Sequence, residues 1–348
     1  MHTHTPHIRP LTRAALLGTA ILLLSCTKTE IMQQESGDGA ITFTNVGTKA
    51  PVESFKAGDS FSVWSWREAG DAQYAVFDAT EVSTTDGTDW GYSGLQYWLP
   101  DCTYSFYAVY PAVQDLKEGV LAGCTSAGTV TISGFDASAI GPDAVDMMTA
   151  SRTDMVTQYG LAAPSPVDFT FTHALTRIRF AVKLSEDIPA GYKVSVSSLR
   201  LEAYLKGDMI YDIQKGISWV PDEKSYSMID LSAENGALKQ GKIISDGTNA
   251  GSVTISSVGY ELLMVPQEMS EYHGVGIDYK IENDVEPGNS GYWEIVNSST
   301  VGLSSQAAWN PGESLTYSII ISNQSVSVQL SVGDWEDGNS GNEDIGFE

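Results

Sequence analysis

The chain has 348 residues, of which 44 are Asp or Glu and only 19 are Lys or Arg, so its formal net charge is −25. This field repels nucleic acid and anionic membrane surfaces, which makes both poor partners. Three of the five histidines lie within the first seven residues, which leaves few groups for metal binding or acid–base catalysis.

The first 25 residues have the features of a lipoprotein signal peptide. Arg9 and Arg13 precede an apolar stretch, residues 14–24, which is shorter than the roughly 20 residues that a membrane-spanning helix needs. The stretch ends in Leu23-Leu24-Ser25-Cys26, the pattern of a lipobox, and the alternative is an ordinary signal peptide with an incidental cysteine. We expect Cys26 to carry acyl chains that anchor the protein. Thr27 after the cysteine favours the outer membrane.

A polar tether, residues 26–39, leads into the first predicted strand, residues 40–48. Ile41 and Phe43 point to one face of this strand, while Thr42 and Thr44 point to the other, because side chains alternate along a strand. Lys49-Ala50-Pro51 ends the strand, since proline cannot donate to a ladder.

Alternating apolar residues predict the next strands at residues 61–66, 74–82 and 102–110, and two more within residues 167–184. In the 102–110 strand, Tyr104, Phe106, Ala108 and Tyr110 share one face, and Ser105, Tyr107 and Val109 share the other. The stretch between residues 111 and 166 is interpreted as mostly loop.

A second set of short strands follows a break near Pro189, and convincing amphipathic helices are absent. The predicted strands are residues 194–213, 225–231, 253–255, 261–265, 275–281, 292–295, 314–321 and 326–332. Such spacing favours an all-β protein of two tandem antiparallel β-sandwich domains, at residues 40–187 and 188–335. From Trp335 onwards the chain is too polar to pack, and residues 336–348 form a tail.

Seven aromatic residues gather in the first domain and allow two interpretations. They are Trp64, Trp66, Tyr74, Trp90, Tyr92, Tyr97 and Trp98. Aromatic rings stack on sugars, which suggests a glycan site, but the period-2 placement favours core packing.

The remaining candidates for chemistry have a structural interpretation beside the functional one. Cys102 and Cys124 form a disulfide or are two buried core residues. His173 is a hydrogen-bonded core residue or a base, and Asp334 with its neighbours is a solvated turn or a calcium loop. No nucleophile elbow, phosphate-binding loop or zinc motif is present, so we predict no catalytic, cofactor-binding or metal-binding residues and no enzyme activity.

Several segments in order resemble the fimbrillin family of lipoprotein pilins and adhesins. The first matching segments are Ile41-Thr-Phe43, Thr48-Lys-Ala50, Phe55-Lys-Ala-Gly-Asp-Ser-Phe61, Tyr97-Trp-Leu-Pro100 and Tyr104-Ser-Phe-Tyr-Ala-Val-Tyr-Pro111. They continue with Asp146-Met-Met-Thr-Ala150, Phe169-Thr-Phe-Thr-His-Ala-Leu-Thr-Arg-Ile-Arg-Phe180, Trp309-Asn-Pro-Gly312 and Tyr317-Ser-Ile-Ile-Ile321.

The resemblance implies that both domains are transthyretin-like sandwiches. It also implies that a trypsin-like protease cuts after the first strand, so that a strand from another subunit fills the vacated groove by β-augmentation. The matching position is Lys49-Ala50, with Lys where the family typically has Arg and with Pro51 following. Because residues 326–332 are interpreted as the second domain's own last strand, the chain suits a tip or accessory position better than a shaft.

The expected function is therefore that of a non-enzymatic fimbrial subunit or adhesin at the outer membrane. Its expected partners are other pilus subunits, the membrane through the lipid on Cys26, and a glycan or host surface ligand. The alternatives are a glycan-binding surface lipoprotein that does not polymerise and a surface hydrolase without a recognisable motif.

Overall fold

The computed structural model describes residues 39–48, 55–164, 166–185, 192–231, 242–244, 252–253, 262–322 and 325–335. The chain divides into a short unit, Met1–Gln33, which lies outside these ranges, and a unit from Gln34 to Glu348. In the described ranges, the secondary structure is 21 strands and three short 3-10 helices, η1 (Val113–Asp115), η2 (Gly141–Asp143) and η3 (Glu223–Ser225). The predicted all-β class is confirmed. No helix in these ranges is long and apolar enough to cross a membrane.

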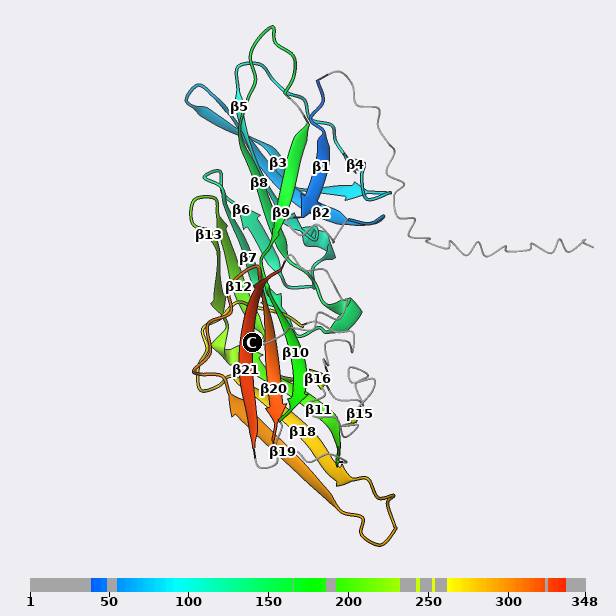
Figure 1. Ribbon diagram of the computed structural model, residues 1–348. Coiled ribbons are helices and arrows are strands. Elements are labelled where there is room, and N and C mark those ends of the chain that lie inside the picture. The colour runs from blue at the N-terminus through cyan, green and yellow to red at the C-terminus, as the bar shows by residue number, and fades with distance from the viewer. Residues whose placement is uncertain are drawn as a thin grey trace, which may run out of the picture. The chain divides into compact units, whose positions relative to one another are not determined.

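Seven strands of the N-terminal half close into a barrel (Figure 1). Their order around the barrel is β1-β4-β3-β2-β5-β8-β9, and β1 completes the circle by pairing with β9. The strands are β1 (Phe43–Thr48), β2 (Ser60–Ala69), β3 (Ala72–Thr84), β4 (Trp90–Tyr92), β5 (Thr103–Tyr110), β8 (Met148–Val156) and β9 (Val167–His173). The predicted strands at residues 40–48 and 102–110 are thus confirmed, whereas β8 lies in the stretch that was interpreted as loop.

The barrel interior is filled largely by aromatic side chains. Its core includes Phe43, Phe61, Phe77, Phe106 and Phe169, each at most 2% exposed. On β5, Tyr104 and Phe106 face this interior, while Tyr107 and Val109 belong to a second core on the outer side of the barrel. The two faces predicted for this strand are therefore confirmed, and both are buried.

A four-stranded sheet supplies the other side of that second core. Its order is β13-β12-β7-β6, with β6 (Leu121–Cys124), β7 (Thr129–Asp136), β12 (Lys206–Asp212) and β13 (Gly216–Pro221). Val130 and Ile132 of β7 pack with Met209 of β12 and with Trp64 of the barrel. The sequence interpretation of residues 111–166 as mostly loop was wrong here, because β6 has only four residues and Gly134, at φ +77°, interrupts the alternation along β7.

The C-terminal half contains two further sheets that enclose a third core. One has the order β16-β10-β20-β21, with β17 also paired to β10, and the other has the order β14-β11-β18-β19, with β15 paired to β11. The strands are β10 (Thr176–Leu184), β11 (Tyr192–Tyr204), β14 (Tyr226–Asp230), β15 (Lys242–Ile244), β16 (Ser252–Val253), β17 (Leu262–Met264), β18 (Gly274–Asn283), β19 (Glu294–Gly302), β20 (Glu313–Ile321) and β21 (Val326–Asp334). Inward residues such as Leu199, Ile277 and Ile319 form this core. Layers of this kind are the expected outcome when strands have one apolar face.

The division into two tandem transthyretin-like domains remains a prediction, since the expected boundary near Pro189 lies outside the described residues. The strand pairing adds two facts. β10 precedes that boundary and pairs in parallel with β20 of the C-terminal half, from Arg177–Ser314 to Leu184–Ile321. β12 follows it and pairs with β7 of the N-terminal half.

Trp335 corrects the prediction that the chain stops packing at this residue. Its side chain is only 5% exposed, and its ring stacks on that of His173 with centroids 4.0 Å apart and an interplanar angle of 6°. The Arg177 guanidinium lies 5.2 Å from the Trp335 ring centroid. A single aromatic residue in a polar stretch has no period that a sequence pattern could reveal.

Candidate strand-exchange site

The first strand is the element on which the expected function depends. Ile41 and Phe43 are 0% and 2% exposed, whereas Thr42 and Thr44 are half-buried. The predicted alternation of inward and outward side chains is therefore confirmed for this part of the strand. Full burial of two such side chains contributes about 1.5–3 kcal/mol each.

Phe43 lies at the centre of an aromatic cage in the barrel. Its ring is stacked on Phe169, with centroids 5.9 Å apart and an angle of 15° between the planes. Four further rings lie 5.7–6.3 Å away, those of Phe61, Phe77, Tyr92 and Phe106. Aromatic pairs at these separations each contribute about 0.5–1.5 kcal/mol beyond burial, so Phe43 is the main side-chain anchor of β1.

The backbone leading into β1 is held from both sides. The Ile41 amide donates to the Gln96 carbonyl at 2.8 Å, and the Trp98 amide donates to the Gly39 carbonyl at 3.0 Å. The Val167 amide at the start of β9 donates to the Thr42 carbonyl at 2.8 Å. This regular pairing fixes the register in which Ile41 and Phe43 enter the core.

The second half of β1 pairs less regularly. Thr44 lies opposite Asp168 and Gly47 lies opposite Thr170, so that three steps along β1 match two steps along β9. The extra residue is a β-bulge, which leaves one residue out of the ladder. On its other side β1 pairs with β4 at Phe43 and Trp90. The backbone of residues 39–43 is therefore paired on both sides, whereas the bulge interrupts the ladder between Thr44 and Thr48.

β1 provides most of the backbone pairing of its neighbour β9. β9 pairs with β1 from Val167 to Phe171, whereas its pairs with β8 are Met148–His173 and Thr149–Thr172. Removing β1 would consequently expose the backbone donors and acceptors of β9 together with the pockets of Ile41 and Phe43. An exposed edge with empty pockets is a template for another strand.

The residues predicted for lipidation and cleavage lie outside the described residues. Cys26 precedes them, and Lys49 and Ala50 fall in the gap that follows β1. Both assignments stay predictions. β1 ends at Thr48, so the proposed cut lies directly beyond its irregular half.

The aromatic residues that suggested a glycan site are mostly part of the core. Trp64 and Trp90 are 2% and 9% exposed, which supports the packing interpretation. Tyr97 is 50% exposed and Tyr74 is 47% exposed, with the Arg67 guanidinium 4.3 Å from the Tyr74 ring centroid. A glycan site on these two remaining rings stays a prediction.

The two cysteines are free thiols in different cores. Cys102 is buried in the barrel interior, and Cys124 is partly buried against the second core. Burial raises the pKa of the Cys124 thiol to about 12. Of the two interpretations of these residues, the structure supports packing.

The two histidines in the described ranges are both packed and hydrogen-bonded. His173 is 3% exposed and its Nδ1 lies 2.9 Å from an Asp146 carboxylate oxygen. Nδ1 of His273 accepts from the Ser270 amide at 3.0 Å, and its Nε2 lies 2.7 Å from Gln267 Oε1. Burial lowers the pKa of His273. The structural interpretation of His173 is thus supported, and the described part of the chain contains no group of three or more His, Cys, Asp or Glu arranged for a metal ion.

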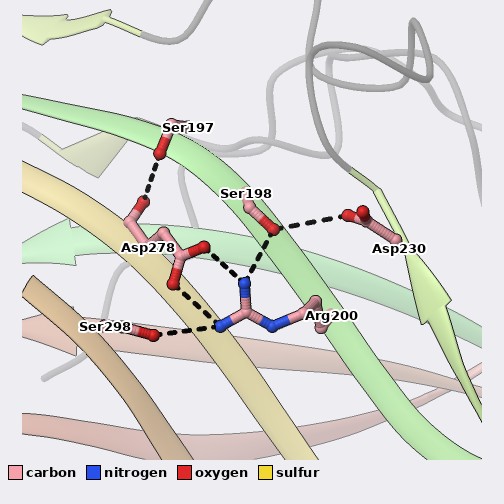
Figure 2. Close-up of polar contacts among 6 residues, drawn as sticks. All are labelled: Ser197, Ser198, Arg200, Asp230, Asp278 and Ser298. Atoms are coloured by element: carbon pink, nitrogen blue, oxygen red, sulfur yellow. Dashed lines mark hydrogen bonds and ion pairs between the residues drawn. The ribbon is translucent and has the colours of Figure 1, made fainter.

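A polar network that the sequence interpretation missed crosses the outer face of the β14-β11-β18-β19 sheet (Figure 2). Arg200 donates from Nη2 to Asp278 Oδ1 at 2.8 Å and to Ser298 Oγ at 3.3 Å. Its Nη1 donates to Ser198 Oγ at 3.1 Å, which in turn donates to Asp230 at 3.3 Å. The hydrogen bonds from Arg200 hold the pKa of Asp278 below its usual range.

The network depends on a glycine beneath the arginine. A Cβ atom at position 276 would lie 2.9 Å from Arg200 Nε, so Gly276 lets the guanidinium lie flat across β18. The signal in the sequence was the alternation of Arg200 with the core residues Leu199 and Leu201, which places it on the outer face. The network joins four strands, so its role is to stabilise the sheet.

Comparison with known proteins decides the family. The fimbrillin-like family profile matches residues 48–335, which span β2 to β21. The chain belongs to the fimbrillin-like family. The resemblance inferred from the sequence motifs is confirmed.

Two known proteins are similar to this chain over large parts of its length. The fimbrium subunit Fim1C of Phocaeicola vulgatus is 24% identical over 211 residues, which are 54% of this chain and 55% of that protein, so the match spans about half of the relative's length. The crystal structure of a fimbrial protein from Bacteroides vulgatus ATCC 8482 is 18% identical, with a TM-score of 0.58 over 86% of this chain and 100% of the other. At this identity the second similarity concerns the fold alone.

Proposed function

We propose that this chain is a non-enzymatic subunit of a cell-surface fimbrium that assembles by donor-strand exchange at the position of β1. The observation that carries the proposal is the place of β1 in the barrel. The strand closes the circle between β4 and β9, and its Phe43 fills an aromatic cage. Membership of the fimbrillin-like family and the similarity to a fimbrium subunit support the same function.

The proposed assembly has two steps. Cleavage between Lys49 and Ala50 breaks the covalent link to β1 while the packing of Ile41 and Phe43 still holds the strand. A strand from another subunit then pairs with β9 in its place and inserts its own apolar side chains. Incoming hydrogen bonds and side chains replace those that are lost, which is the principle of β-augmentation.

We further propose that the precursor is an outer-membrane lipoprotein held by acyl chains on Cys26. The signal peptide of residues 1–25 with its lipobox supports this anchor. Its partners are other pilus subunits and the membrane, while the net charge of −25 opposes binding to nucleic acid. Replacing Cys26 with Ala should release the protein from the membrane fraction, and retention of the processed variant in that fraction would contradict the anchor.

Within the fimbrium, we propose that this subunit occupies a tip or accessory position. β21, which would have to be free to serve as a donor, pairs with β20 from Glu313–Asp334 to Ile321–Val326. Its Val328 and Leu330 pack against the C-terminal core. A groove-bearing subunit whose last described strand is engaged in its own sheet accepts a partner more readily than it donates to one.

A second candidate function is a glycan-binding surface lipoprotein that does not polymerise, for which the half-exposed Tyr97 is the supporting observation. N-terminal sequencing of the protein from sheared surface filaments separates the two. The fimbrial proposal expects a start at Ala50. Recovery only as the full mature chain with acylated Cys26, in the membrane and never in filaments, would favour the second candidate. Replacing Lys49 with Gln provides the matched control and should prevent the Ala50 start.

A further inference from the structure

The two halves of β1 differ in a way that strand exchange itself does not require. At its start, Phe43 and the preceding Ile41 are at most 2% exposed, and the backbone of residues 39–43 pairs on both sides. In the second half, the bulge between Thr44 and Gly47 interrupts the ladder with β9. Bulges leave a residue unpaired, and glycine inside a strand weakens it further.

Gly47 is not required by its surroundings. No atom lies within 4 Å of the position that its Cβ would occupy, and its φ is outside the left-handed region. A strand with a β-branched residue here would therefore fit the same groove and would have a higher preference for extended backbone. Position 47 therefore holds a residue of low strand propensity where a residue of higher strand propensity would fit.

We propose that β1 is built in two parts, in which residues 44–48 form a toehold where an incoming strand begins to pair and Ile41 with Phe43 form an anchor that is released last. This inference rests on the strand exchange proposed above. An incoming strand starts at the end of β1 next to Lys49, because the cut frees that end and beyond the bulge only the pairs Gly47–Thr170 and Thr48–Phe171 hold β1 to β9. Exchange then proceeds along β9 towards Phe43.

The groove also defines the chemistry of the strand that it accepts. The strand runs parallel to β9, as β1 does. It carries an aromatic residue at the position of Phe43, because five rings surround that site, and an aliphatic residue two positions earlier in place of Ile41. At the position of Gly47 it carries a β-branched residue and no bulge precedes it, so that it pairs with Thr170 and Phe171 in a continuous ladder.

The test uses the mature chain with an engineered protease site in place of Lys49-Ala50, cut before the measurement. A fluorescent peptide with the sequence of residues 40–48, but without Asn45 and with Val at the Gly47 position, is added, and its binding rate is followed by anisotropy. We expect the Gly47→Val protein to exchange about three- to fivefold more slowly than the original, because a stronger second half closes the toehold. A variant lacking Asn45, which removes the bulge, should slow the exchange in the same direction and serves if Gly47→Val does not fold.

Two controls separate this inference from the function on which it rests. Protein without residues 26–49 has no strand to displace, so the peptide should bind it quickly. A peptide with Ala at the Phe43 position should start to bind but fail to displace β1 completely.

The outcomes distinguish the two proposals. If exchange occurs but is equally fast in the original, the Gly47→Val and the Asn45-deleted proteins, the toehold is wrong while donor-strand exchange stands. If no peptide binds even to the protein without residues 26–49, donor-strand exchange at this site is itself wrong.

Discussion

Replacing Phe43 with Ala tests whether β1 is an essential part of the barrel core. The Phe43 side chain is 2% exposed and contacts five aromatic rings at centroid distances of 5.7–6.3 Å. Truncating a fully buried phenylalanine to alanine costs about 3–5 kcal/mol of unfolding free energy, from the lost transfer energy and the cavity that remains. Since a typical domain has about 5–15 kcal/mol in total, the variant should be close to the limit of folding.

A milder substitution at the same position separates volume from ring geometry. Phe43→Leu keeps most of the buried volume but loses the aromatic pairs, each of which contributes about 0.5–1.5 kcal/mol. It should therefore be destabilised by an intermediate amount, about 1–3 kcal/mol.

The free energy of unfolding is measured by urea denaturation monitored through tryptophan fluorescence, with equal slopes required for comparison. Tyr159, which is 83% exposed, provides the control, and Tyr159→Ala should change the free energy by less than about 0.5 kcal/mol. A loss below about 1 kcal/mol in Phe43→Ala would refute the reasoning, because it would mean that the aromatic cage does not depend on β1.

Three further predictions concern the rest of the fold. Trp335→Ala should lower the unfolding free energy by about 3–5 kcal/mol, because the ring is buried against His173 and Arg177. Val332→Ala, at an exposed position of β21 three residues earlier, should have little effect in the same denaturation assay. Asp278→Asn should cost about 0.5–1 kcal/mol of unfolding free energy at pH 7, because Arg200 lowers the folded pKa of Asp278. This difference should persist down to the usual Asp pKa of about 3.9 and vanish as the pH falls through the lower folded value. A loss that does not depend on pH would contradict the ion pair. Burial lowers the folded pKa of His273, so below about pH 6.5 the unfolded chain binds a proton that the folded chain does not. The unfolding free energy, measured from pH 7 to pH 5, should therefore fall less steeply in His273→Gln than in the original protein. Identical slopes would exclude His273 as the cause.

The sequence was most informative where apolar and polar residues alternate within a single strand. In β5, four alternating residues from Tyr104 to Tyr110 predicted both the strand and its inner face, and the structure confirms them. Ile41 and Phe43 were assigned to the core on the same grounds, and both are buried. These predictions succeed because side-chain alternation is a local property of extended backbone.

The sequence was least informative where contacts join distant parts of the chain. Arg177 and the Trp335 carbonyl are hydrogen-bonded although 158 positions separate them, and the Arg200–Asp278 pair spans 78 positions. β7 pairs with β12, and neither strand's local pattern identifies the other as its partner. The bulge in β1 was also missed, since it appears only when the register against β9 is known.

The family could be identified from the order of short motifs, most of which lie within the region that the family profile matches, residues 48–335. The proposed lipidation and cleavage residues are assigned on different grounds from the groove beside β9. Cys26, Lys49 and Ala50 are recognised by enzymes as linear segments, so their assignment depends on sequence and calls for a biochemical test. The β1 groove, by contrast, is a property of the fold and can be tested physically.

The measurement that tests the central claim most directly is thermal unfolding of the protein without residues 26–49, compared with the intact mature chain. The account predicts a lower melting temperature for the shortened protein, because β9 and the pockets of Ile41 and Phe43 are left open. It also predicts that a peptide of residues 39–48 restores the melting temperature, whereas the same peptide with Ala at the Phe43 position does not. Equal melting temperatures for the two proteins, with no effect of the peptide, would contradict the claim that β1 is a replaceable strand.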